Sequence, residues 1–229
     1  MKAIVFDSST IISIAMNNLL WTLGPLRKQF KGEFYIPLSV KEEVIDAALR
    51  TKRFKLEGLQ IQNEIVEGNL TLYTEDLIKE IHEIESIANS TFACNGNDIH
   101  IIDKGEIAAL ALCQKIGAEV LFIDERTTRL LIEAPNMLAS ILHNKMHKQV
   151  HINKENLSFI HKRMKGIHIL RSVEFGVAAY ELGLLDKYMP QKTQETKRQL
   201  LDAVLWGMKL RGCAVSDFEI QQIMEKEIK

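Results

Sequence analysis

Short apolar runs alternate with amphipathic stretches along the first 132 residues of this 229-residue chain. Four of the runs are rich in β-branched and aromatic residues, as strands buried on both faces are, and they cover residues 3–6, 34–36, 70–73 and 120–123. The amphipathic stretches have helical spacing and cover residues 8–20, 39–52, 75–88 and 104–116. This order predicts a parallel sheet with helices on both faces, which is a three-layer α/β/α fold.

The rest of the chain, from Thr127 onward, has a sequence that is almost entirely helical in pattern. One further apolar run, Ile167–Leu170, predicts an edge strand. No Pro-, Gly- or Ser-rich linker separates the two parts. We therefore predict one compact domain, in which residues 1–132 form the α/β core and residues 133–229 form a basic, His-rich helical segment and C-terminal helices that complete it.

Several classes of protein are disfavoured by what the sequence lacks. Cys94, Cys113 and Cys213 form no CxxC pair, so we expect no disulfide framework and no structural zinc site, and we predict a cytoplasmic location. The first apolar run is preceded by one lysine and is interrupted by Asp7, unlike a signal peptide, and no run of ~18 apolar residues predicts a membrane span. There is no Gly-rich phosphate loop and no GxSxG motif, which disfavours nucleotide-binding and serine-hydrolase functions.

Acidic residues stand where the predicted strands end. Asp7 closes the first strand and Asp124 closes the last, while Glu43 and Glu106 lie near the starts of two helices. Ligands of open parallel sheets bind beyond the carboxyl ends of the strands, so a fold that brings these segments together would gather four carboxylates in one crevice. Each exposed pair at contact distance repels by about 1 kcal/mol even in water. Divalent cations that prefer oxygen ligands, Mg²⁺ or Mn²⁺, would neutralise such a group.

The segments that carry these acids resemble the PIN-domain family of metal-dependent ribonucleases. They are IVFDSSTII at 4–12, IPLSVKEEVI at 36–45, DKGEIAALAL at 103–112 and VLFIDERTTRLL at 120–131. The C-terminal segment HILRSVEFGVAAYELGLLD at 168–186 is similar to that of a prokaryotic PIN-like subfamily with a helical C-terminal extension. The resemblance implies a three-layer PIN-like fold, an acidic metal site and hydrolysis of RNA phosphodiester bonds, either as a toxin-type enzyme or in RNA processing.

The resemblance also implies roles for individual residues. The catalytic and metal-binding acids of the family correspond to Asp7, Glu43, Glu106 and Asp124, and they would hold Mg²⁺ or Mn²⁺. The third acid is ambiguous, because Asp103 stands at the start of the same helix as Glu106 and could share the metal. The supporting hydroxyl groups are those of Ser9 and Thr127. A protein partner such as an antitoxin, and a homodimer, are further expectations from the family.

Each acid also has a structural interpretation. Asp7 suits the N-cap of the helix that follows it, and Asp103 with Glu106 has the spacing of a capping box. Glu42 stands three residues after Ser39, again as in a capping box, and we expect its side chain to be exposed. These interpretations support an alternative function, a catalytically inactive PIN-like module that binds RNA or a protein partner.

Basic residues concentrate in the segment 141–171, which holds seven lysines and arginines against a single acid, Glu155. The residues that we expect to contact the RNA backbone are Lys145, Lys148, Lys162, Arg163 and Lys165, together with Arg126 and Arg129 near the last strand-end acid. A solvated helical face is the alternative. If the segment is one helix, His143, His147 and His151 lie on one face at spacings of four, and we favour exposed or RNA-facing histidines over a zinc site.

Overall fold

A parallel sheet of five short strands lies at the centre of the molecule. The computed structural model describes residues 2–228, and its main sheet has the spatial order β3-β2-β1-β6-β8. The strands are β1 (Ala3–Phe6), β2 (Glu33–Pro37), β3 (Thr71–Tyr73), β6 (Val120–Phe122) and β8 (His168–Leu170). Every neighbouring pair in this sheet is parallel, as predicted. The predicted strand at 167–170 is β8, and it lies at the edge beside β6.

Helices cover both faces of this sheet, and the central strand β1 contributes to a separate core on each face. Ile4 and Phe6 belong to one buried cluster, whereas Ala3 and Val5 belong to the other, because successive side chains of a strand point to opposite faces. The predicted three-layer α/β/α fold is therefore confirmed.

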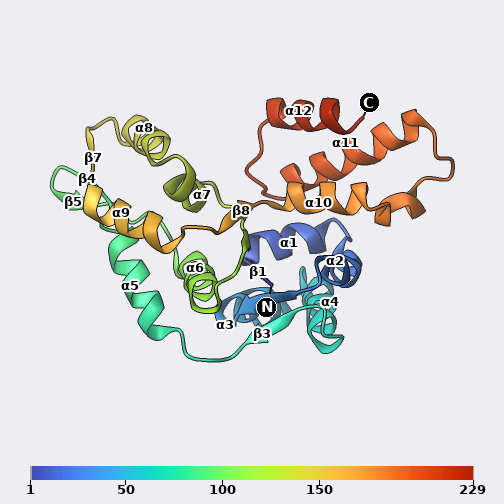
Figure 1. Ribbon diagram of the computed structural model, residues 1–229, viewed down its shortest axis with the longest axis horizontal. Coiled ribbons are helices and arrows are strands. Elements are labelled where there is room, and N and C mark those ends of the chain that lie inside the picture. Colours follow the sequence, from blue (N-terminus) through green and yellow to red (C-terminus); the bar gives the residue numbers. More distant parts are fainter. Residues whose placement is uncertain (1, 229) are drawn as a thin grey trace.

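Different helices pack on the two faces, and Figure 1 shows α1 and α10 on one side of β1 and α5 and α6 on the other. The first face carries α1 (Ser8–Met16), α2 (Leu23–Phe30), α3 (Leu38–Lys41), α4 (Lys55–Val66), α10 (Ser172–Glu181), α11 (Gln194–Leu210) and α12 (Asp217–Glu227), with the short turns η1 (Leu20–Thr22), η2 (Glu42–Ala47) and η3 (Leu184–Tyr188). The second face carries α5 (Ile78–Ala88), α6 (Lys104–Ile116), α7 (Arg126–Glu133), α8 (Pro135–Met146) and α9 (Lys154–Arg163).

A second, antiparallel sheet lies beside α8 and α9, and the sequence pattern did not predict it. It consists of β4 (Phe92–Cys94) between β5 (Asn97–Asp98) and β7 (Val150–Ile152). The prediction of an almost wholly helical segment after Thr127 is therefore wrong at residues 150–152. The signal is the alternation of apolar Val150 and Ile152 with His151, which has the period of a strand.

The predicted stack of three histidines on one helix is also wrong. Helix α8 ends at Met146, and His147 has a left-handed backbone conformation with φ of 52°. His151 lies in β7 and pairs across the sheet with Ala93. The histidines therefore belong to a helix, a turn and a strand, since the left-handed residue ends the helix before the third one.

Arg171 holds the C-terminal helices together at the start of α10. Its side chain is buried and donates to Glu174 at 2.7 Å, to Glu219 of α12 at 2.8 Å and to the backbone carbonyl of Ala214 at 3.0 Å. Although burial raises the pKa of Glu219, hydrogen bonds from Ser216 and Arg171 lower it to about 2. One guanidinium group thus joins α10, α12 and the loop before α12.

None of the helices described within residues 2–228 combines the length and the apolar character that crossing a lipid bilayer requires.

Candidate functional site

Asp7 lies at the carboxyl end of β1, where the chain turns into α1. Its Oδ2 accepts hydrogen bonds from the backbone N–H of Ser9 at 3.0 Å and from the Ser9 hydroxyl at 2.6 Å, so the predicted N-cap is confirmed. Its Oδ1 is buried and has no hydrogen-bond partner. Burial raises the pKa of Asp7, the hydrogen bonds from Ser9 oppose this, and the charge of Glu43 raises the pKa further. Capping therefore uses one oxygen of Asp7 and leaves the other free.

Ser9 links two of the strand-end acids. Its hydroxyl group donates to Asp7 and accepts the backbone N–H of Asp124 at 3.1 Å. The backbone N–H of Asp7 donates in turn to the carbonyl of Phe122 at 2.9 Å. The ends of β1 and β6 are thus fixed to one another, and the orientation of the Asp7 carboxylate is fixed with them.

Glu106 lies in the first turn of α6, and its carboxylate, like that of Asp7, has a buried oxygen without a partner. Its Oε2 is buried and has no hydrogen-bond partner. Burial and the negative charge of Asp7 raise the pKa of Glu106 to about 7, and the charges of Asp103 and Glu125 add to this. Asp7 and Glu106 are therefore electrostatically coupled across the edge of the sheet.

Asp103 occupies the N-cap position of α6, but its side chain does not cap the helix. It is 84% exposed and pairs with His100 at 3.1 Å. The capping box expected for Asp103 and Glu106 is therefore wrong, because neither side chain makes the reciprocal bonds to the backbone. The two candidates for the third acid differ clearly, since Asp103 is turned toward solvent and Glu106 is half-buried beside Asp7.

Glu43 lies near this pair. Its Oε2 lies 3.8 Å from the position that a Cβ atom on Gly105 would occupy, directly before Glu106. Glu43 and its neighbour Glu42 are both exposed. Since the charge of Glu43 also raises the pKa of Asp7, three carboxylates lie around one point at the start of α6.

The backbone that carries Glu43 differs from the expected regular helix. Helix α3 begins at Leu38 after Pro37 and gives way at Glu42 to η2, a π-helical turn. The expected capping box of Ser39 and Glu42 is wrong, because Pro37 is the N-cap and the Ser39 hydroxyl group is buried without a hydrogen-bond partner. A π turn adds one residue to the hydrogen-bonded loop, and such turns occur often at functional sites.

Asp124 follows β6 and is fully engaged in hydrogen bonds. Its Oδ1 accepts the backbone N–H of Ser172 at 2.6 Å, and its Oδ2 accepts the Ser13 hydroxyl at 2.6 Å. Only 1% of its surface is exposed. The structure therefore places Asp124 beside Asp7, through Ser9, but without an oxygen that lacks a partner.

Glu125 is a further carboxylate at this edge that the sequence analysis did not include among the site residues. It is the N-cap of α7 and accepts the backbone N–H of Thr128 at 2.6 Å. Its charge raises the pKa of Glu106, so it belongs to the same electrostatic environment. In the sequence, Glu125 could have been recognised by its position directly after the strand-end acid Asp124 and directly before a predicted helix, where acidic residues are favourable. Thr127, expected to support the site, lies half-buried in the first turn of α7.

The predicted RNA-contacting residues fall into two groups. Four lysines, Lys145, Lys148, Lys162 and Lys165, are exposed along α8, α9 and the adjoining loops. Arg163 differs, because it pairs with Glu83 at 2.6 Å and stacks on Phe159. The second group, Arg126 and Arg129, lines a cavity of about 500 Å³ beside α7.

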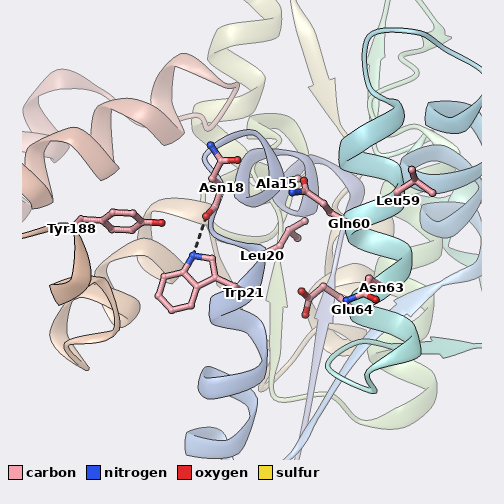
Figure 2. A pocket seen from close by; sticks show the side chains of 9 residues that line it. All are labelled: Ala15, Asn18, Leu20, Trp21, Leu59, Gln60, Asn63, Glu64 and Tyr188. Atoms are coloured by element: carbon pink, nitrogen blue, oxygen red, sulfur yellow. Dashed lines mark hydrogen bonds between the residues drawn. The ribbon is translucent and has the colours of Figure 1, made fainter.

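A separate cavity of about 540 Å³ lies toward the far end of α1 (Figure 2). Trp21 and Tyr188 line it, and the indole N–H of Trp21 donates to the carbonyl of Asn18 at 3.0 Å. It contains none of the predicted site residues. Because Ala15 lies at its wall and Asp7 precedes the first turn of α1, the two sites are separated by roughly 12 Å of helix.

The side chains of the acidic group decide whether it could hold a metal ion. Within the described part of the chain, residues 2–228, no group of three or more His, Cys, Asp or Glu side chains could hold a metal ion as it stands. Two carboxylates of this group, those of Asp7 and Glu106, nevertheless have a buried oxygen without a partner, and Glu43 lies next to them. Carboxylate oxygens are the ligands that Mg²⁺ and Mn²⁺ prefer, so the chemistry of these donors fits such an ion.

The sequence of the chain matches a known family. A family model described as a PIN domain matches residues 3–137, which is more than half of the chain. The chain belongs to the PIN-domain family. No curated protein and no solved structure matches this PIN-domain chain. PIN domains have a nuclease-type fold and typically use divalent metals.

Proposed function

We propose that this PIN-domain protein is a metal-dependent endoribonuclease that hydrolyses RNA phosphodiester bonds. One observation carries the proposal. Asp7 and Glu106 come from different elements, each has a buried carboxylate oxygen without a partner, and the charge of Asp7 raises the pKa of Glu106. A buried carboxylate oxygen without a partner is unfavourable, so two of them on acids whose charges act on one another favour a missing cationic partner.

Asp7, Glu106 and Glu43 are the residues that would hold Mg²⁺ or Mn²⁺ in this proposal. The half-buried Glu106 is preferred over Asp103, which is exposed and paired with His100. When bound, such an ion lowers the pKa of a water molecule and stabilises the charge that develops on phosphate oxygens.

Other residues of the chain position this group. Ser9 orients Asp7 through the oxygen that would not bind the ion, and it holds the backbone of Asp124 at the same time. Asp124 is then a positioning residue that joins β6 to α1 and α10. The exposed lysines of α8 and α9 supply positive charge for the RNA backbone.

A second candidate function is a catalytically inactive PIN-like module that binds RNA or a protein partner. The observation that favours it is the engagement of both Asp124 oxygens in hydrogen bonds within the protein. This module would bind RNA in a salt-sensitive way, would need no metal and would leave the RNA intact.

Cleavage of an end-labelled single-stranded RNA distinguishes the two functions. The full chain is assayed in Mg²⁺, in Mn²⁺ and in EDTA, with Asp7→Asn, Glu106→Gln and Glu43→Gln. We expect cleavage in metal only, and a loss of more than about a hundredfold in each variant, since even residues outside the ligand shell contribute roughly 10–100-fold.

Two matched controls accompany these variants. Glu42→Gln removes the neighbouring exposed carboxylate of η2, and Asp103→Asn removes the exposed carboxylate of α6. Both should cleave like wild type. Equal cleavage by wild type and by the Asp7 and Glu106 variants would refute the proposed site, and RNA binding without cleavage in any metal would support the inactive module.

A further inference from the structure

The cavity that contains Arg126 and Arg129 lies between the PIN domain and the C-terminal helices. Arg126 and Arg129 of α7 and Met137 of α8 form one wall. Residues 214–216 and Glu219 form the opposite wall, and they lie outside the region that the family model matches. Its volume is about 500 Å³, so the cavity is larger than a small inorganic anion requires.

Positive charge in this cavity is not balanced by the protein. Within residues 2–228, neither Arg126 nor Arg129 forms an ion pair, and the Nε–H of Arg129 is buried without an acceptor. Glu219 is the acid of the lining, but it already pairs with Arg171 at 2.8 Å. A buried guanidinium N–H without an acceptor is unfavourable, and the natural complement is an anionic oxygen.

The cavity adjoins the acidic edge of the sheet. Arg126 directly follows Glu125, whose charge raises the pKa of Glu106. On the opposite wall, the backbone N–H of Ala214 donates to the backbone carbonyl of Asp124 at 3.3 Å. Both walls are therefore fixed to the residues at the end of β6.

We infer that this cavity is a phosphate subsite that binds a phosphodiester of the RNA strand next to the one at the acidic group. The inference rests on the proposed function for the identity of the strand. The planar fork of an arginine matches two phosphate oxygens, and both Arg126 and Arg129 line this cavity without forming an ion pair within residues 2–228. Met137 and Val215 also line the cavity, and their apolar side chains provide contact area for the nucleoside attached to the phosphate. A free phosphate ion would leave this apolar part of the cavity empty.

In this inference the C-terminal helices take part in binding the RNA. Because residues 214–216 and Glu219 are half of the lining residues, they form part of the surface that positions the substrate. Arg171 contacts two of these residues, because it donates to the carbonyl of Ala214 and to the carboxylate of Glu219.

Binding of a fluorescent single-stranded RNA to the full chain in EDTA, measured by anisotropy over a range of salt concentrations, tests the subsite. Arg129→Ala and Arg126→Ala should each weaken binding about tenfold, because a hydrogen bond to a charged group is lost. Each should also reduce the slope of log affinity against log salt by about 0.7, the value for one phosphate contact with a single strand. Arg198→Ala removes an equal charge from an exposed position on α11 and should change neither quantity.

A second pair of variants leaves both arginines in place. Met137→Glu puts a negative charge into the cavity from an exposed position on α8, whereas Val66→Glu puts the same charge at an exposed position at the end of α4, outside the lining and outside the helices that carry the RNA-contacting lysines. We expect a loss of RNA affinity for Met137→Glu alone. Thermal melts of all variants verify that each one is folded.

The outcomes separate this inference from the proposed function. If wild type binds and cleaves RNA and the arginine and Met137 variants behave like their controls, the subsite is refuted and the function stands. If no metal supports cleavage but Arg129→Ala still weakens RNA binding, the subsite stands on an inactive module. If inorganic phosphate raises the melting temperature of wild type but not of Arg129→Ala, and RNA binding is the same in both, the cavity binds free anions and the inference is refuted.

Discussion

The carboxylate of Asp124 accepts the backbone N–H of Ser172 at 2.6 Å, which joins the end of β6 to the first residue of α10. The other oxygen accepts the hydroxyl group of Ser13 in α1. An aspartate at the end of a central strand thus connects the sheet to helices from both ends of the chain. Asp7, one strand away, instead keeps one oxygen free.

This difference predicts opposite effects of two conservative substitutions on stability. Asp124→Asn replaces one acceptor oxygen by an NH₂ group, so it should lower the free energy of unfolding by about 1–3 kcal/mol. Asp7→Asn removes a buried carboxylate whose pKa is raised by burial, so it should leave the stability unchanged or increase it. Urea denaturation in EDTA measures both. A larger loss for Asp7→Asn than for Asp124→Asn would contradict the assignment.

Ser9→Ala should affect stability and activity together. The substitution removes the hydroxyl group that bonds to Asp7 and to the backbone of Asp124, at a cost of about 1–2 kcal/mol. If Asp7 binds a metal, its freer carboxylate should raise the metal concentration needed for half-maximal cleavage by about tenfold. Ser140→Ala, which removes an exposed hydroxyl group on α8, is the control, and it should leave the metal titration curve unshifted.

Glu106 predicts how stability depends on pH when no metal is added. Its pKa in the folded protein is about 7, above the ordinary value of 4.5, so the folded state binds this proton more tightly than the unfolded state. The resulting stabilisation is complete below pH 4.5 and is lost as the pH rises through 7. In thermal melts in EDTA from pH 5 to 8, the melting temperature of wild type should therefore fall relative to that of Glu106→Gln. Glu42→Gln should follow wild type, and parallel curves for wild type and Glu106→Gln would exclude this shift.

Arg171→Ala should loosen the C-terminal helices. The substitution leaves Glu174 and Glu219 without their partner and removes the donor to the Ala214 carbonyl. We expect a loss of about 2 kcal/mol, less than the 3–5 kcal/mol for a fully buried pair because both glutamates are partly exposed. Arg171→Lys should not restore the lost stability, since an ammonium group does not reproduce the planar fork of N–H donors of the guanidinium group. Hydrogen exchange in residues 213–227 should increase in both variants, and unchanged exchange would refute this role.

The sheet and two of the free carboxylates were predictable because their signals are local. A buried apolar strand followed by an acid, as at Asp7, is visible within five residues of sequence. The strands β4, β5 and β7 have only two or three residues each, and at Val150–Ile152 the alternation covers only three positions, which does not outweigh the helical pattern on both sides of it. The π turn at Glu42 depends on how η2 packs, and sequence spacing alone does not encode it.

The hydrogen bonds of Asp124 were not predictable for a different reason. Its partners, Ser13 and Ser172, lie 111 and 48 positions away in the sequence, so only the folded structure reveals that both oxygens are engaged. Likewise, only the folded structure reveals that the Nε–H of Arg129, which lines the cavity, has no hydrogen-bond acceptor.

The position of β8 has a consequence for synthesis on the ribosome. β8 covers the edge of β6, but it lies at residues 168–170, beyond the region that the family model matches. Translation must therefore proceed past Leu170 before this edge is covered, while β1, β2, β3 and β6 have already emerged. Until then the nascent chain presents the open edge of β6, whose backbone groups can pair with a strand of another molecule.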